Sequence, residues 1–221
     1  MRFLPAGPSA LLVELESTSA VLALVAEIDR RRAAGWDRRV VDVVPGATTV
    51  LLDGLDDVEA IAGELTHWTW PGAGGDGGGD SDGDGDGDGA CGGRTAPAVE
   101  VPCRYGGPDL AAVAAHWGVA VEDVPALHTG LDHRVAFCGF APGFAYIAGL
   151  GPLGGVPRLP TPRSSVPAGS VAVAGDFTGV YPRSSPGGWQ IIGRTDAVLW
   201  DPARPSPALL APGTVVRFVA T

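Results

Sequence analysis

The residues best suited to chemistry lie in the second half of the chain, in four segments rich in glycine, proline and arginine. These segments are GFAPGFAYIAGL, PRLPTPRSSVPAGS, YPRSSPGGW and IIGRT. Arginine presents a planar fork that suits a carboxylate or a phosphate, and glycine lets backbone N–H groups approach a ligand closely. Proline leaves a loop little conformational freedom to lose on binding. The combination predicts an anion-binding wall that contains Arg158, Arg163, Arg183 and Arg194.

Any one of these arginines could equally face solvent in a tight turn, and it is their grouping that favours a site. His128 is the best-placed titratable residue because it follows a predicted helix and precedes a predicted strand, although a lone histidine is often structural. We predict that His128, Arg163 and Arg194 are catalytic and line one pocket with Arg158, and we predict no metal ligands. The predicted substrate-binding or nucleotide-binding residues are Gly143, Phe144, Arg158, Gly187, Gly188, Trp189 and Thr195. The aromatic residues of these segments could equally belong to a core.

Several common catalytic motifs are absent from the sequence. It has no G-x-S-x-G nucleophile elbow, no G-x-x-x-x-G-K-[ST] loop, no H-E-x-x-H pair and no dinucleotide-binding fingerprint. The chain is therefore not a self-sufficient enzyme of those classes, and we expect that a nucleotide, if one is used, needs another subunit.

A scaffold of two parts is predicted to position these segments. Residues 1–70 alternate strands, at 10–14, 39–44 and 48–52, with helices that begin near Ser17 or Ser19 and near Asp56, which predicts a small α+β domain. Residues 97–221 begin with a strand at 98–102 and helices at 109–117 and 121–128. The short β-rich runs that follow favour a closed or nearly closed barrel: RVAFCGF, SVAVAG, WQIIGRT, AVLW and TVVRFVA. The predicted fold class is α+β.

Residues 71–96 are rich in glycine and aspartate and are predicted to form a flexible linker or insertion, because they have little apolar surface to bury. Asp80, Asp82, Asp84 and Gly85 match the front of a calcium-binding loop. Cys91 stands at the twelfth position, where a bidentate glutamate is required. The solvated linker is therefore the better interpretation.

Charge and cysteine content restrict the partners and the compartment. The formal net charge is −10, and six of the aspartates lie in the Gly/Asp-rich segment. The remainder is only mildly acidic, so we expect neither nucleic acid nor a membrane as partner. The start of the chain shows no secretory signal, and the three cysteines show no C-x-x-C spacing, which predicts a cytoplasmic protein with free thiols.

The order and spacing of several runs resemble the 5-oxoprolinase B-subunit family, also called the allophanate hydrolase subunit 1 or carboxyltransferase-type family. The runs are FLPAGPSALLVEL, VVDVVPGATTVLLD, YGGPDLAAVAAHWG, LHTG, GFAPGFAYIAGL, PRLPTPR, VPAGSVAVAG, YPRSSPGGWQIIGRT and PGTVVRF. The resemblance implies a small α+β amino-terminal domain followed by a cyclophilin-like β-barrel. One departure follows Tyr105, where the family usually has a longer glycine-rich turn with an acidic residue, whereas here Gly106-Gly107 leads directly to Pro108-Asp109.

The resemblance also implies a function. It implies the B subunit of an ATP-dependent 5-oxoprolinase, which hydrolyses 5-oxo-L-proline to L-glutamate in a hetero-oligomer with A-like and C-like subunits and is inactive alone. ATP, with Mg²⁺, would act in the assembled complex and would not be bound tightly by this chain alone. Two alternatives stay open: a carboxyltransferase-like component of urea or allophanate metabolism, and a regulatory inhibitor of a histidine kinase.

Overall fold

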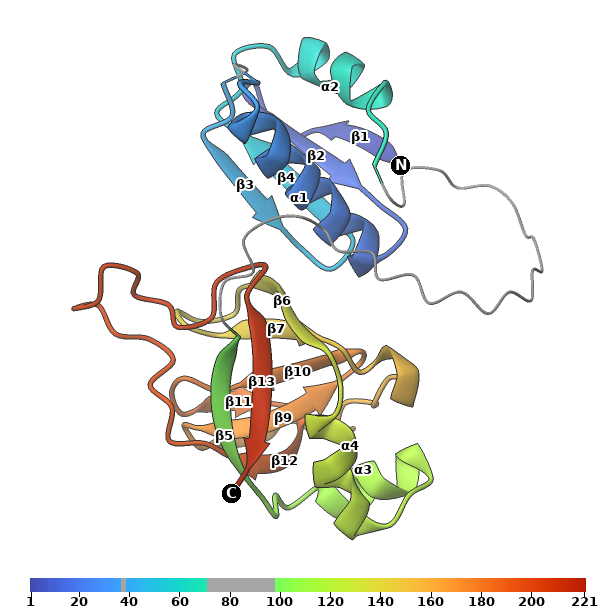
Figure 1. Cartoon of the computed structure of the whole chain (residues 1–221), viewed down its shortest axis with the longest axis vertical. Coiled ribbons are helices and arrows are strands. Elements are labelled where there is room, and N and C mark those ends of the chain that lie inside the picture. Colours follow the sequence, from blue (N-terminus) through green and yellow to red (C-terminus); the bar gives the residue numbers. More distant parts are fainter. Residues whose placement is uncertain (37–38, 71–97) are drawn as a thin grey trace. The chain divides into compact units, whose positions relative to one another are not determined.

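The computed structural model describes residues 1–36, 39–70 and 98–221, which fall into two compact units (Figure 1). The first unit is Met1–Val43 with Thr48–Pro97, and the second is Val44–Ala47 with Ala98–Thr221. The predicted linker at 71–96, its rejected calcium loop and Cys91 lie outside the described residues. The predicted boundaries of the domains stay a prediction.

The first unit is a four-stranded sheet with two helices. The strands have the order β1-β2-β4-β3. They are β1 (Arg2–Pro5), β2 (Ala10–Glu14), β3 (Asp42–Pro45) and β4 (Thr49–Asp53), and the helices are α1 (Thr18–Ala33) and α2 (Val58–Thr66). The core lies where the buried faces of both helices meet the alternate residues of β2 and β4 that point inward, as the period of two along a strand requires.

The two helices begin at the capping residues that the sequence offers. The Ser17 side chain accepts the Ala20 N–H, and the Asp57 side chain accepts the Ala60 N–H at 2.9 Å. Along α1, Val21, Leu24 and Ile28 are fully buried, which is the helical spacing expected of a core-facing stripe.

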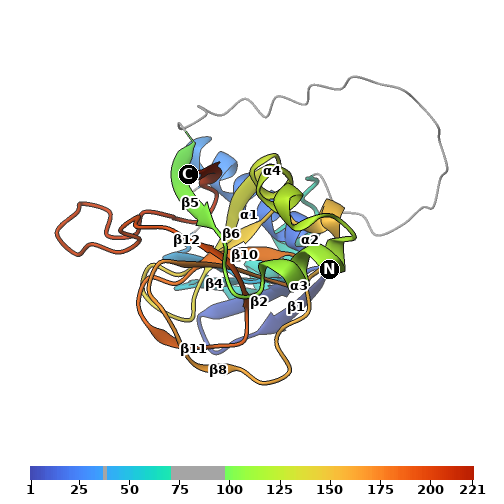
Figure 2. The same cartoon turned by 90° about the horizontal axis from the view of Figure 1, so that it is seen from below.

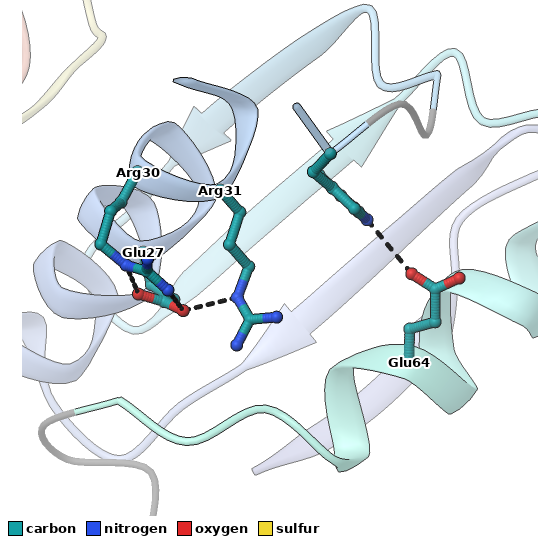
Figure 3. Close-up of polar contacts among 5 residues, drawn as sticks. Glu27, Arg30, Arg31 and Glu64 are labelled. Carbon is teal, nitrogen blue, oxygen red and sulfur yellow. Dashed lines mark hydrogen bonds and ion pairs between the residues drawn. The ribbon is translucent and has the colours of Figure 1, made fainter. Parts of the chain in front are cut away.

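An ion-pair cluster ties down the end of α1 (Figure 3). Glu27, only 9% exposed, accepts hydrogen bonds from Arg30 and Arg31. These arginines, chiefly Arg30, lower the pKa of Glu27 to about 2. The Arg31 guanidinium in turn lies 4.1 Å from the centre of the Trp68 ring, a cation–π contact. The cluster thus joins α1 to the chain beyond α2 and stabilises the first unit.

The second unit is a closed barrel of seven strands in the order β10-β7-β6-β13-β5-β12-β9. All neighbouring strands are antiparallel except β5 and β13, which are parallel. The strands are β5 (Val99–Tyr105), β6 (His133–Cys138), β7 (Ala145–Ala148), β9 (Ser170–Ala174), β10 (Phe177–Val180), β12 (Gln190–Arg194) and β13 (Val215–Ala220).

Shorter elements complete the second unit. A two-stranded ribbon, β8 (Arg163–Val166) paired with β11 (Ser185–Gly187), lies at the edge of the barrel (Figure 2). The helical segments are α3 (Leu110–Trp117), η1 (Val121–Asp123), α4 (Val124–Thr129) and η2 (Gly151–Leu153). A long loop between β12 and β13 projects from the barrel in both views (Figures 1 and 2).

The predicted α+β fold class, with a small α+β part followed by a barrel, is confirmed, and the local differences have physical causes. The predicted strand AVLW is wrong: within it only Trp200 makes an isolated bridge, to Ala208. The predicted helix 121–128 is split into η1 and α4, with Pro125 in the first turn of α4, where proline is tolerated. Strands β1, β7, β8, β10 and β11 were not predicted, because each is five residues or shorter and several contain glycine or proline.

No single helix among the described residues is both long enough and apolar enough to cross a membrane. The bent pair Leu110–Trp117 and Val121–Thr129 passes by length and composition alone, with a 95° angle between its halves.

Candidate functional site

The barrel carries an arginine-lined cavity of about 520 Å³, which we call the arginine cavity. It lies where the ends of β5 and β12 meet β8 and the Gly106–Pro108 turn. Its charged and hydroxyl-bearing lining residues are Arg104, Tyr105, Arg163, Ser165, Ser170 and Arg194, and Gly106, Gly107 and Gly193 are among the others. The short turn after Tyr105 therefore lines this cavity and brings no carboxylate of its own into it.

Arg163 is held in place by a buried carboxylate. Its Nη2 donates to Asp109 Oδ1 at 2.7 Å, and Asp109 Oδ2 accepts the Ile191 N–H at 2.6 Å. Asp109 is 8% exposed, so this charge-assisted contact is largely shielded from solvent. The Nη1 of Arg163 is buried without a hydrogen-bond partner among the described residues. Asp109 thus positions the Arg163 guanidinium and leaves its Nη1 group without an acceptor.

Arg194 and Arg104 face each other on neighbouring strands. They are Cα partners in the pairing of β12 with β5, and Arg194 is also the partner of Ser170 on β9. Arg104 donates to Asp196 at 2.8 Å, whereas no ion pair or hydrogen bond is seen for the Arg194 side chain in the described part of the chain. Like charges directly opposite on adjacent strands destabilise a sheet. The charge of Arg194 also lowers the pKa of Asp196, after the larger effect of Arg104. The cavity therefore retains a guanidinium that makes no direct contact with a carboxylate among the described residues.

A second, smaller cavity of about 110 Å³ is lined by aromatic rings, and we call it the aromatic cavity. Phe144, Tyr181 and Trp189 are nearly buried, and Phe144 and Trp189 meet edge to face at 5.5 Å and 85°. Phe140 is 61% exposed and has φ 66°, the one positive φ of a non-glycine residue among those described. Such strained conformations cluster at functional sites. The full lining is Phe140, Phe144, Tyr146, Arg158, Tyr181, Pro186, Gly187, Gly188 and Trp189.

Two glycines allow these rings to sit so close to the backbone. A Cβ on Gly179 would lie 2.7 Å from Phe144 Cζ and 2.9 Å from Trp189 Cζ3. A Cβ on Gly187 would lie 2.3 Å from the Tyr181 hydroxyl oxygen. The rings are therefore wedged against main chain, and the cavity is preformed.

The predicted site residues divide between these cavities. Arg163 and Arg194 lie together in the arginine cavity. Gly143 lines neither cavity: it has φ 83° and packs against Trp200, whose Cβ would be 2.7 Å from an added Cβ. Thr195 lies with Arg194 beside a third cavity of about 270 Å³, and its hydroxyl accepts the Ala197 N–H. The aromatic cavity collects Phe144, Arg158, Gly187, Gly188 and Trp189.

The predicted single pocket of Arg158, Arg163, Arg194 and His128 is wrong. Arg158 belongs to the other cavity, and His128 lines neither, because it is fully buried. Its Nδ1 lies 2.7 Å from the Tyr105 hydroxyl and its Nε2 lies 2.9 Å from Thr178 Oγ1. Burial, and the nearby His133, lower the pKa of His128 well below its ordinary value. With both ring nitrogens partnered, His128 packs as a core residue, and its catalytic role stays a prediction.

Sequence reasoning missed Arg104, Asp109 and Tyr181, and it weighed Tyr146 mainly as a core residue. Asp109 precedes α3, where an aspartate is expected to cap the helix, yet its side chain makes no capping hydrogen bond and turns instead to Arg163. That missing cap cannot be predicted from sequence. Tyr146 lies in the GFAPGFAYIAGL segment and Tyr181 in YPRSSPGGW, so the motifs themselves were a usable signal.

The described residues contain no group of three or more His, Cys, Asp or Glu side chains that could hold a metal ion. Cys103 and Cys138 are free, and burial raises the pKa of Cys103 to about 11 and that of Cys138 above its ordinary value. Both thiols therefore stay protonated at neutral pH. The donors that do fit part of a nucleotide are the guanidiniums of the arginine cavity, which suit phosphate oxygens.

Curated proteins resemble about half of this chain. It is 52% identical over 124 residues to the 5-oxoprolinase B subunit of Escherichia coli O157:H7, covering 55% of this chain and 57% of that protein. It is 47% identical over 124 residues to the protein of the same name from Bacillus subtilis (strain 168), covering 55% and 52%. The chain thus spans about half the length of the curated relatives that it matches.

A solved structure and a family profile match a larger part of the chain than these relatives do. The crystal structure of TTHA0988 superposes with a TM-score of 0.69 and 30% identity, covering 96% of this chain and 39% of that one. Residues 1–210 match the family described as carboxyltransferase domain, subdomain C and D. The chain therefore belongs to this carboxyltransferase-domain family, which confirms the resemblance seen in its motifs.

Proposed function

We propose that this chain is one component of an ATP-dependent 5-oxoprolinase that hydrolyses 5-oxo-L-proline to L-glutamate together with A-like and C-like subunits. The observation that carries the proposal is the aromatic cavity with Arg158 at its lining. The substrate is a five-membered lactam with one carboxylate. It therefore requires a small apolar enclosure and one cation, and this cavity supplies both.

The dimensions and chemistry of the aromatic cavity support that assignment. Its volume of about 110 Å³ is well below the roughly 300–1,000 Å³ of pockets for drug-sized ligands, so it suits one small ring. Arg158 is exposed, and no ion-pair partner is seen for it within the described ranges. Its fork is free to take a carboxylate in a bidentate manner. Trp189 and Phe144 would then cover the ring, with Gly187 and Gly188 leaving room at the wall.

Partner proteins and ATP belong to the same proposal. The relatives are named as subunits, and this chain spans about half of their length, so it is proposed to act only within a complex. An unstrained lactam amide resists water, and phosphorylation of the amide oxygen by ATP would supply the activation. The chain's part is to bind the lactam, to hold its carboxylate and to present cations toward developing negative charge. The predicted cytoplasmic location stays a prediction.

The test is turnover by the assembled complex. The chain is co-expressed with the A-like and C-like subunits, and glutamate formation from 5-oxo-L-proline is measured with and without ATP. Arg158→Gln is expected to raise KM for 5-oxo-L-proline about tenfold or more, because a charge-assisted contact is lost. The matched control is Arg217→Gln, an exposed arginine on β13 that lines neither cavity. Unchanged kcat and KM in Arg158→Gln would overturn the assignment of the aromatic cavity.

A further inference from the structure

We infer that the arginine cavity is a binding site for a phosphoryl oxyanion, carried either by a nucleotide or by a phosphorylated small molecule. The inference rests on the proposed function for the origin of that phosphoryl group. It adds that this chain, and not only a partner, holds the group. The evidence lies in the charges of the cavity, in its hydrogen-bond donors and in the number of guanidiniums that line it.

The charges around the arginine cavity do not balance. Asp109 pairs directly with Arg163 and Asp196 with Arg104, whereas Arg194 makes no direct ion pair among the described residues and meets Asp196 only through longer-range attraction. Two carboxylates thus face three guanidiniums. An anion that enters the cavity gains a cation without a direct ion pair, Arg194, and a second cation, Arg163, whose position a buried carboxylate already fixes, so ordering Arg163 costs little.

The placement of Arg194 opposite Arg104 also supports an anion site. Direct cross-strand neighbours lie about 4.5–5.5 Å apart at Cβ, so two guanidiniums here repel each other while the cavity is without an anion. An anion bound between the two strands attracts both guanidiniums and so offsets the repulsion between them. Asp196 offsets this repulsion only in part because it is exposed, and a bound oxyanion would offset more of it.

Hydroxyl groups add neutral donors beside the cations. Ser165 Oγ lies 2.8 Å from Ser184 Oγ, across the ribbon that the two P-R-S-S segments form through β8 and β11. In such a pair one hydroxyl donates to the other, so the acceptor keeps its own proton for a further partner. Ser170, the Cα partner of Arg194, lines the same cavity and is 4% exposed. Arginine forks with serine hydroxyls are a donor set suited to phosphate oxygens.

The number of guanidiniums favours a phosphoryl group over a carboxylate. A carboxylate has two oxygens in one plane and is satisfied by one guanidinium fork, whereas a phosphoryl group has three free oxygens that point apart. Arg104, Arg163 and Arg194 come from three different strands, β5, β8 and β12. Three guanidiniums around one cavity exceed what a single carboxylate can use, and they suit the three oxygens of a phosphoryl group.

The backbone does not supply an alternative oxyanion site at the glycine turn. The N–H groups of Gly106 and Gly107 both donate to the Ile192 carbonyl oxygen, at 3.2 and 3.1 Å. Anion recognition in this cavity therefore depends on side chains, and substitution of those side chains tests it directly.

The experiment is calorimetric titration of the full chain, without partners, against four probes: inorganic phosphate, pyrophosphate, ATP and L-glutamate. The phosphate-containing probes are expected to bind at least about tenfold more tightly than L-glutamate. Arg194→Gln is expected to weaken phosphate binding about tenfold or more, Arg194→Lys less, and Ser165→Ala about threefold. Arg217→Gln is the control and should bind like the unaltered chain. Arg194 is exposed, so these variants should keep the fold, which circular dichroism verifies.

The results distinguish the two sources and can overturn the inference. Tighter binding of ATP than of inorganic phosphate identifies a nucleotide, and equal binding identifies a phosphorylated small molecule. No binding of any phosphate probe, equal binding of L-glutamate, or full binding by Arg194→Gln overturns the site. The titration needs no turnover, so it stands or falls separately from the effect of Arg158→Gln on the complex.

Discussion

The Tyr105 hydroxyl lies 2.7 Å from Nδ1 of His128 inside the second unit. The opposite ring nitrogen lies 2.9 Å from Thr178 Oγ1, so the histidine links the end of β5 to β10. His133 lies beside it and uses its Nε2 to donate to the His128 carbonyl oxygen. Burial of these side chains disfavours a positive charge on the His128 ring, whose pKa is lowered accordingly.

The free energy of unfolding is expected to fall as the pH drops below about 6.5, the ordinary histidine pKa. Burial lowers the pKa of both His128 and His133 in the folded chain, so the unfolded chain takes up protons first. Their contribution is fully present above the unfolded pKa and is lost as the pH falls toward the folded one. Denaturant unfolding at pH 8 and at pH 5 measures the change.

Two variants separate this effect from general acid destabilisation. His128→Gln removes one titrating group and should flatten the dependence between pH 8 and pH 5. His116→Gln, at an exposed position where Nε2 contacts the Gly155 carbonyl oxygen, should leave it unchanged. The explanation fails if both variants keep the slope of the unaltered chain.

Glu27→Gln is expected to lower the stability of the first unit by about 1 kcal/mol at pH 7, a modest value because Arg30 is exposed. The folded pKa of about 2 lies below the ordinary value, so the ion pairs contribute fully above pH 4.5 and are lost as the pH falls toward 2. Melting temperatures of the two chains should therefore converge at acidic pH. A difference that does not depend on pH would contradict the ion-pair explanation.

Gly179→Ala is expected to destabilise the second unit by about 1–3 kcal/mol, because its new Cβ would overlap Phe144 and Trp189. Gly151→Ala is the matched control, since a Cβ there meets nothing within 4 Å. Chemical denaturation followed by Trp fluorescence measures both. Equal stability of the two variants would show that the aromatic rings can move aside at no cost.

Arg163→Lys is expected to reduce turnover of the assembled complex by about tenfold or more without weakening assembly. Lysine keeps the charge but loses the planar fork that Asp109 holds at 2.7 Å. Arg183→Lys, in the second P-R-S-S segment and outside the lining of both named cavities, is the control. Co-purification measures assembly and glutamate release measures turnover. Full activity in Arg163→Lys would make Arg163 a structural residue.

Local signals predicted much of the scaffold, and long-range contacts account for what they missed. Ser17 and the apolar spacing of Val21 and Ile28 predicted α1, since capping and amphipathicity act within a few residues. Nothing local marks Phe177–Val180 as β10, a strand defined by its pairing with β7 and β9. Short strands of this kind form because partners are available, and partners far away in sequence cannot be predicted from a local pattern.

The candidate site shows the same division. The motifs identified arginines, glycines and aromatic residues of the right types, and most of them do line cavities. Which arginine joins which cavity depends on barrel register, such as Arg194 opposite Arg104, and on the unexpected partner Asp109. His128 was misplaced because a histidine at the end of a helix looks alike in sequence whether it faces solvent or a core.

The parallel pairing of β5 with β13 has a consequence for synthesis on the ribosome. Val99 lies opposite Val216, so β5, the first strand of the barrel to be synthesised, pairs with β13, the last one. Until β13 emerges, β5 and β6 each present an unpaired edge, and contacts of such long range form slowly. A nascent chain halted after β12 is thus expected to be captured by chaperones or to aggregate. The barrel closes only when β13 has emerged from the ribosome and pairs with β5 and β6.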